Sequence, residues 1–99
     1  MAARKIIWSN LAKVKLYDTL NYFAERNKSK TYSEKLYKRI NKELRLLIKQ
    51  PDFGIKTEIE NVRGLIVGDY ILFYEVNKDF IIVHTLWDCR QNIENLKIK

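Results

Sequence analysis

The sequence has very few of the residues that build disulfides, metal sites and phosphate-binding loops. One cysteine, Cys89, and one histidine, His84, exclude an internal disulfide and a zinc site of the usual Cys/His type. The three glycines are scattered at positions 54, 64 and 68, so there is no glycine-rich phosphate loop. We therefore expect the protein to need neither a metal nor a cofactor.

Long hydrophobic runs are also missing. No apolar segment approaches the ~20 residues that a membrane-spanning helix needs. The N-terminal segment reaches the polar residues Ser9 and Asn10 too early for a secretory signal peptide. The 99 residues are 46% hydrophobic and 12% aromatic, which is enough for one compact core. These features predict a single domain over residues 1–99 that resides in the cytoplasm and has no membrane contact.

Charge is plentiful but unevenly distributed. Residues 1–50 hold 13 basic and four acidic side chains, a net +9, whereas residues 51–99 hold six basic and eight acidic ones, a net −2. The whole chain therefore carries +7. A strongly basic first half favours association with a polyanion or with an acidic protein partner.

The first half predicts one strand and two helices. A short β-favouring run is followed by Ser9 and Asn10, either of which can cap a helix. Apolar residues then recur at three- and four-residue steps in two segments joined by four or five polar residues, which is typical of an antiparallel helical hairpin. The expected elements are a strand at 4–8, a helix from 11 to about 26, and a helix from about 31 or 33 to 49.

After Pro51 the pattern changes to strands and tight turns. Segments 62–67, 70–76 and 80–87 are rich in Ile, Val, Tyr and Phe, and they are separated by turn residues at 68–69 and 77–79. They predict a three-stranded antiparallel meander, and the tail 91–99 can add a helical turn. The fold class is therefore α+β, with the order β-α-α-β-β-β and an N-terminal helical hairpin packed on a small antiparallel sheet.

The second predicted helix carries a regular row of cations, which we call the cationic stripe. Steps of three and four residues place them along one side of the helix. Such a stripe is either an ordinary solvated helix face or a docking surface for an acidic partner or for phosphates. Its members are Lys35, Lys38, Lys42, Arg45 and Lys49.

Two arginines and the histidine are the candidate catalytic residues of the second half. Arg63 begins a strand and Arg90 follows the last one, so we expect both at one rim of the sheet near Asp88. Arginine suits a phosphate site because its planar fork makes bidentate bonds, but Arg90 could instead pair with Asp88. His84, inside the last predicted strand, is either a half-buried structural residue or a general base.

With these segments in place, the sequence resembles the RelE/ParE superfamily of bacterial type II toxins. The stretch VRGLIVGDYILFYEV from Val62 to Val76 is similar to a family segment in which an arginine leads a strand, a Val-Gly turn follows, and two tyrosines mark the central strand. FIIVHTLWDCRQN from Phe80 to Asn92 ends in the Asp-x-Arg-Gln-Asn pattern of one subgroup. The resemblance covers nearly the whole chain, from the first strand and the Trp8-Ser9 entry through the helical hairpin ending near Pro51 to Asn92.

The resemblance implies a growth-inhibiting toxin, of the kind that serves in plasmid stabilisation, held inactive by a cognate antitoxin. Operator DNA would be contacted only through that antitoxin. We expect the partner segment to be acidic and partly disordered, and to add as a strand at the sheet edge or to lie as a helix in a groove. The cationic stripe, Asp88 and Arg90 are the expected partner-binding residues.

Two mechanisms occur in the superfamily, and the sequence favours one of them. RelE-like members cut mRNA on the ribosome and tend to carry basic side chains at what would be positions 64, 66 and 71, whereas ParE-like members poison DNA gyrase. This chain has Gly64, Ile66 and Ile71 there. We therefore expect a non-enzymatic toxin that acts on gyrase or a related replication target. The alternative is a ribosome-dependent mRNA endoribonuclease in which Arg90, Arg63 and His84 are catalytic.

Overall fold

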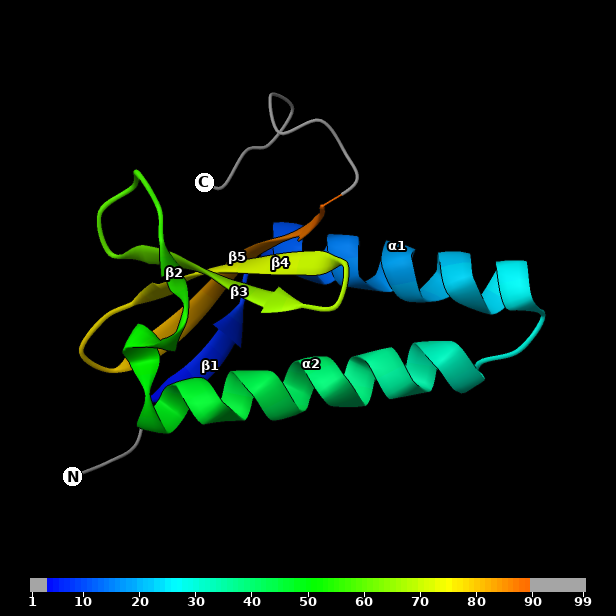
Figure 1. Cartoon of the computed structure of the whole chain (residues 1–99), viewed down its shortest axis with the longest axis horizontal. Helices are drawn as coiled ribbons and strands as arrows, with labels where there is room; N and C mark the ends of the chain where they lie inside the picture. The colour runs from blue at the N-terminus through cyan, green and yellow to red at the C-terminus, as the bar shows by residue number, and fades with distance from the viewer. Residues whose placement is uncertain (1–3, 90–99) are drawn as a thin grey trace.

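The computed structural model describes residues 4–89 and contains a helical hairpin on one face of a mixed sheet (Figure 1). The chain begins with one strand, forms two long helices, and then makes the rest of the sheet. In chain order the elements are β1 (Lys5–Trp8), α1 (Asn10–Asn27), α2 (Thr31–Lys49), the 3-10 helix η1 (Pro51–Phe53), β2 (Ile55–Lys56), β3 (Val62–Val67), β4 (Tyr70–Val76) and β5 (Phe80–Asp88). The α+β class and the order β-α-α-β-β-β are confirmed, with η1 and β2 as additions.

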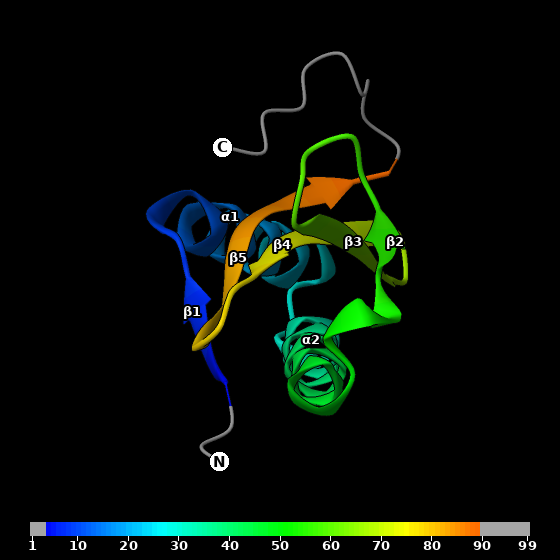
Figure 2. The same cartoon turned by 90° about the vertical axis from the view of Figure 1, so that its left-hand side faces the viewer.

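The sheet has five strands in the order β1-β5-β4-β3-β2. The antiparallel meander β3-β4-β5 is present as predicted, but β1 joins it in parallel beside β5, with Ile6 opposite Ile81. The predicted antiparallel sheet is thus extended at one edge by a parallel strand that the sequence did not place. Figure 2 shows β1 and the two-residue strand β2 at opposite edges of the sheet. The parallel pairing is possible because the long α1–α2 connection separates β1 from the other strands.

The two helices begin and end close to the predicted positions. Ser9 is the N-cap of α1, and its Oγ accepts a hydrogen bond from the Ala12 backbone N–H at 3.1 Å. The link between the helices has only three residues, 28–30, because Lys28 adopts a left-handed conformation with φ 51° and reverses the chain at once. The Ser29 N–H then donates to the Ala24 carbonyl at 3.1 Å, so this carbonyl near the end of α1 has a hydrogen-bond partner.

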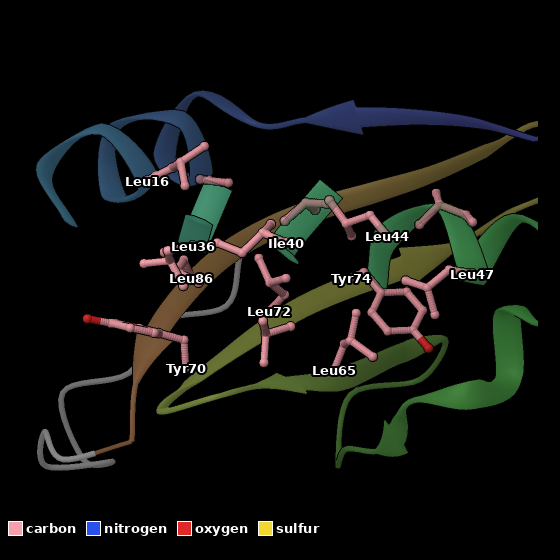
Figure 3. Close-up of a cluster of buried hydrophobic side chains, with 14 residues drawn as sticks. Leu16, Leu36, Ile40, Leu44, Leu47, Leu65, Tyr70, Leu72, Tyr74 and Leu86 are labelled. Carbon is pink, nitrogen blue, oxygen red and sulfur yellow. The ribbon is translucent and has the colours of Figure 1, made fainter. Parts of the chain in front are cut away.

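The main core lies between the helical hairpin and one face of the sheet. Leu16 of α1 and a row of α2 residues face side chains from β3, β4 and β5, and most of these are less than 7% exposed. Figure 3 shows how these side chains meet between the α2 helix and the strands. The labelled residues are Leu16, Leu36, Ile40, Leu44, Leu47, Leu65, Tyr70, Leu72, Tyr74 and Leu86. Neither helix in residues 4–89 is long and apolar enough to cross a bilayer.

A smaller cluster lies on the opposite face of the sheet, which we call the outer face. Val62, Phe73 and Trp87 are buried there, with Ile71 partly buried against them. Successive residues of a strand point to opposite faces, so β4 contributes Leu72 and Tyr74 to the main core and Ile71 and Phe73 to the outer face. One face of the sheet is therefore covered by the helical hairpin and holds the main core, whereas the outer face holds only the smaller cluster.

Candidate functional site

Arg63, a predicted phosphate-binding residue, holds the η1–β2 segment against the sheet. Its guanidinium donates to the backbone carbonyls of Gly54 at 2.9 Å and Asp52 at 3.2 Å. A second nitrogen lies 3.6 Å from the Asp52 carboxylate, and 21% of the Arg63 side chain is exposed. Two of its five N–H donors and one ion pair thus hold Arg63 within the fold.

Tyr74 holds the same η1–β2 segment through two hydrogen bonds of its hydroxyl group. Its buried hydroxyl donates to the Pro51 carbonyl at 2.8 Å and accepts from the Gly54 N–H at 2.9 Å. A Cβ at Gly54 would lie 2.5 Å from that hydroxyl oxygen, so only glycine allows this approach. Burial raises the pKa of Tyr74 above its ordinary value of 10.0, and the Gly54 hydrogen bond partly offsets the rise.

His84 lies at an irregularity of β5 and is held by a carboxylate. The register shifts between Phe73 and Tyr74, so Tyr74 is opposite Val83, Phe73 is opposite Thr85, and His84 has no opposite residue. The Nε2 atom of His84 lies 3.0 Å from Oε1 of Glu75, and the two side chains are 17% and 24% exposed. Sequence reasoning did not identify Glu75, because the pairing depends on the shifted register.

The backbone of His84 is anchored as well. The Ser9 hydroxyl, which caps α1, donates to the His84 carbonyl at 2.8 Å. The start of α1 therefore fixes the bulged part of β5, and the imidazole and carboxylate stay together on one side of the strand. A partly exposed imidazole oriented by a carboxylate is an arrangement that can accept a proton.

The structure does not bring Arg63 and His84 together. Arg63 alternates with Leu65 of the main core, whereas Glu75 pairs with Val62 of the outer cluster, so Arg63 and the His84–Glu75 pair belong to opposite faces. The expectation that Arg63 lies near Asp88 is also wrong. Arg63 is opposite Tyr74, but Asp88 is opposite Tyr70, at the other end of β4. Arg90 and the predicted C-terminal helical turn lie outside the described residues.

The outer face carries apolar side chains where a ribonuclease needs positive charge. Ile66 and Ile71 are opposite each other on β3 and β4, and Ile66 is 54% exposed. Gly64 has no side chain. The side chains of Ile71 and Phe73 lie close to the place where a Cβ atom would stand. Among the residues of β3 and β4, Arg63 is the single cation.

All five residues of the cationic stripe are exposed on α2, but they do not share one environment. Lys38 and Arg45 border a pocket of about 480 Å³ between β1 and α2. Lys35, Lys42 and Lys49 lie outside that pocket. The structure thus divides the stripe into a pair beside an apolar hollow and a solvated row.

Asp88 lies in a different place from the stripe. It lines a polar hollow of about 520 Å³ that also includes Lys15 and Asp18 of α1 and Tyr70 of β4. The Lys15 ammonium lies 6.0 Å from the centre of the Trp87 ring. Within residues 4–89, no group of three or more His, Cys, Asp or Glu side chains is arranged to hold a metal ion.

The helical hairpin and the antiparallel meander are the elements expected from the resemblance to the RelE/ParE superfamily. The family model for the ParE toxin of the type II toxin-antitoxin system, parDE, matches residues 6–93. This chain therefore belongs to the ParE toxin family.

A solved structure has a similar fold. The structure titled "Chromosomal ParDE TA system from P. aeruginosa" matches with a TM-score of 0.70 and 16% sequence identity, over 87% of this chain and 96% of that one. At this identity the likeness concerns the fold. A comparison with curated proteins gives no match.

Proposed function

We propose that this ParE-family toxin inhibits growth by binding DNA gyrase or a related replication target, without cutting RNA. The single observation that carries the proposal is the apolar outer face at Gly64, Ile66 and Ile71. RNA cleavage by attack of a ribose hydroxyl on phosphate builds negative charge in the transition state, which needs preorganised positive donors. A surface of isoleucines supplies none.

Arg63 does not replace the missing cations. Its Nη1 atom is held by the Asp52 and Gly54 carbonyls, its Nη2 atom lies 3.6 Å from the Asp52 carboxylate, and only 21% of its side chain is exposed. Its place on the other face from His84 also argues against a shared active site. The toxin would therefore act through protein–protein contact, and a cognate antitoxin would neutralise it by covering a contact surface. Operator DNA would be reached only through the antitoxin.

A supercoiling assay tests this function. Purified toxin is titrated into gyrase with relaxed plasmid, and a parallel cell-free translation reaction receives the same concentrations. We expect supercoiling to fall while translation continues. Normal supercoiling at a large molar excess of toxin would remove this proposal.

A second candidate function, mRNA cleavage on the ribosome, is favoured by the His84–Glu75 pair. His84 would take the proton of the ribose 2′-hydroxyl, whose oxygen would attack the adjacent phosphorus and displace the 5′-oxygen of the next nucleotide. Glu75 would orient the imidazole, and Arg90 would bind the phosphate, because Arg63 lies on the other face of the sheet. Mapping of mRNA 5′ ends after induction distinguishes the two functions. Codon-phased cleavage that disappears in His84→Ala supports the ribonuclease, and an unchanged set of 5′ ends rules it out.

A further inference from the structure

The segment between α2 and β3 is held tightly although it adds almost nothing to the core. Between residues 50 and 61 only Gly54 is buried, and neither η1 nor β2 contributes a side chain to the two core clusters. Yet the Tyr74 hydroxyl and the Arg63 guanidinium together make four hydrogen bonds to the backbone of this segment. The fold thus fixes the position of residues that it does not use for packing.

The side chains that this segment exposes to solvent are apolar. Phe53 is 58% exposed and Ile55 is 63% exposed. Ile55 is opposite Gly64 on β3, so its side chain lies on the outer face, where Ile66, two residues beyond Gly64, is 54% exposed. Ile55 and Ile66 are therefore diagonal neighbours on one face of the strand pair. We call Phe53, Ile55 and Ile66 the edge strip, since they lie at the β2 edge of the sheet (Figure 2).

Exposed apolar side chains on a fixed backbone are typical of the residues that anchor a protein–protein interface. A single exposed apolar side chain is ordinary, but three neighbouring ones at one sheet edge form a contiguous patch. A segment that is already rigid loses little conformational entropy when it binds a partner. The attachments made by Tyr74 and by Arg63 are separate, so the edge strip keeps its position when one of them is lost.

The border of the edge strip is acidic, unlike the helical hairpin. From Asp52 to Glu60 the chain holds three exposed carboxylates, with Glu58 as the third, and one lysine, which gives a net charge of −2. The lysine, Lys56, is opposite Arg63, so it lies on the hairpin side of the sheet and not beside the edge strip. A matching partner surface combines apolar side chains with lysine or arginine side chains at its rim.

We propose that the toxin binds its replication target through the edge strip, which docks into an apolar hollow of that protein bordered by basic side chains. This inference rests on the proposed function, because it names the contact surface for the same target. Phe53, the largest of the three side chains, would fill the hollow, and Ile55 and Ile66 would cover its margin. The carboxylates on the border would orient the complex.

Other partners match the edge strip less well. A nucleic acid would bring phosphates toward Glu58 and Glu60 and would leave the exposed isoleucines without an apolar partner. An acidic antitoxin segment would meet the same repulsion. A second copy could offer its basic hairpin, but contact between two different surfaces is head-to-tail and builds open chains unless the rotation closes a ring.

The test is gyrase supercoiling with purified toxin variants, gyrase holoenzyme and relaxed plasmid. Phe53→Ala/Ile55→Thr shortens two side chains of the edge strip. Tyr22→Ala/Ile7→Thr makes matched changes at the hairpin tip and on β1, where the side chains are 54% and 41% exposed. We expect half-inhibition to need about tenfold more of the edge-strip variant than of wild type, and less than about twofold more of the control. Circular dichroism and the urea midpoint establish whether both variants are folded.

A charge reversal tests the border of the edge strip separately. Glu58→Lys/Glu60→Lys places two cations beside the strip, and Asp18→Lys/Glu25→Lys makes the same charge change at exposed positions of α1. We expect the border reversal to weaken gyrase inhibition by about fivefold or more, and the α1 reversal by less than about twofold. Equal effects of the two reversals would contradict a basic rim on the target.

Crosslinking locates the contact without relying on a loss of activity. A photoreactive phenylalanine analogue replaces Phe53 in one toxin and Tyr22 in another, and each protein is irradiated with purified gyrase. We expect position 53 to give the covalent product in much higher yield than position 22. An equal or lower yield at position 53, while gyrase is still inhibited, overturns the proposal. Toxin oligomers that the Phe53→Ala/Ile55→Thr change dissociates would assign the edge strip to a second copy and also overturn it.

Failure of this inference is distinguishable from failure of the proposed function. If wild type and the edge-strip variant inhibit gyrase equally, the contact surface is wrong and the gyrase assignment stands. If wild type leaves gyrase unaffected, growth arrest after induction without antitoxin becomes the readout. Loss of arrest in the edge-strip variant but not in its control then supports the docking surface for another target. Equal arrest in both, or no arrest with wild type, overturns it.

Discussion

The helical hairpin and the outer face of the sheet carry opposite surface chemistry. The hairpin presents exposed cations beside an apolar groove, with Lys38 and Arg45 on the rim. The outer face presents Ile66 and Ile71 and a single His84–Glu75 pair. Within residues 4–89, the positive charge is therefore concentrated on the helical hairpin, away from the outer face at Gly64, Ile66 and Ile71. Under the proposed function, the net charge of +7 serves an acidic protein partner rather than RNA.

The largest expected effect is on stability. Side chains of the main core should contribute more to the free energy of unfolding than side chains of the outer face. Leu72 of the main core is fully buried, whereas Ile71, its neighbour on β4, is only partly buried on the outer face. We expect Leu72→Ala to lower the free energy of unfolding by about 3 kcal/mol and Ile71→Ala by about 1 kcal/mol. Urea denaturation of the two variants measures the difference. Equal losses would contradict the assignment of the main core to the hairpin side.

The next largest effect concerns Tyr74, which connects the main core to the η1–β2 segment. Tyr74→Phe leaves the Gly54 N–H and the Pro51 carbonyl without their partner, so we expect a loss of about 1–3 kcal/mol. Thermal or urea unfolding near neutral pH measures it. A loss below about 0.5 kcal/mol would mean that water replaces the hydroxyl.

Tyr74 also predicts a pH dependence above pH 10. Its pKa is raised in the folded state, so the folded protein keeps the hydroxyl neutral while the unfolded chain ionises near its ordinary value of 10.0. The stabilisation is complete below pH 10.0 and is lost as the pH rises through the folded-state pKa. Between pH 9 and 11, the free energy of unfolding of wild type should fall more steeply than that of Tyr74→Phe. Parallel curves would contradict the burial of this hydroxyl.

Replacement of Arg63 tests whether its role is structural or catalytic. Arg63→Ala removes its two hydrogen bonds to backbone carbonyls, and we expect a loss of about 1–2 kcal/mol in unfolding free energy. Gyrase inhibition measured well below the unfolding temperature should remain within about twofold of wild type. Abolished activity in a folded Arg63→Ala protein would place Arg63 in the functional surface instead.

The smallest effect lies at the tip of the helical hairpin, far from both faces. Lys28 holds φ at 51°, a left-handed conformation that is unfavourable for a residue with a Cβ and free of that penalty for glycine. We expect Lys28→Gly to raise the free energy of unfolding by about 0.5 kcal/mol, with no change in antitoxin affinity. Denaturant midpoints measure the gain, and destabilisation would contradict the strain at this position.

The features that repeat along the chain were predictable, and those that depend on distant pairing were not. Helix α2 was predicted almost to the residue, since apolar side chains recur regularly between the polar link and Pro51. The parallel pairing of β1 and the two-residue β2 depend on contacts with β5 and β3, which no local pattern reports. Lys38 differs from its neighbours in the cationic stripe because it borders the pocket between β1 and α2. The sequence of α2 does not show that β1 lies beside it.

The same difference decides which candidate catalytic residues could be found from the sequence. His84 was visible as the only histidine in the sequence. Its partner Glu75 was hidden because the bulge in β5 changes which residues share a face. Arg63 was expected near Asp88 because both are at strand ends, but they belong to opposite ends of the meander.

The proposed toxin acts on replication through a contact surface. The most direct test of this proposal is the order in which labelled precursors cease to be incorporated after the toxin is induced without antitoxin. We predict that thymidine incorporation into DNA falls first, while methionine incorporation into protein continues. Loss of methionine incorporation first would contradict the account and indicate the ribosome as the target.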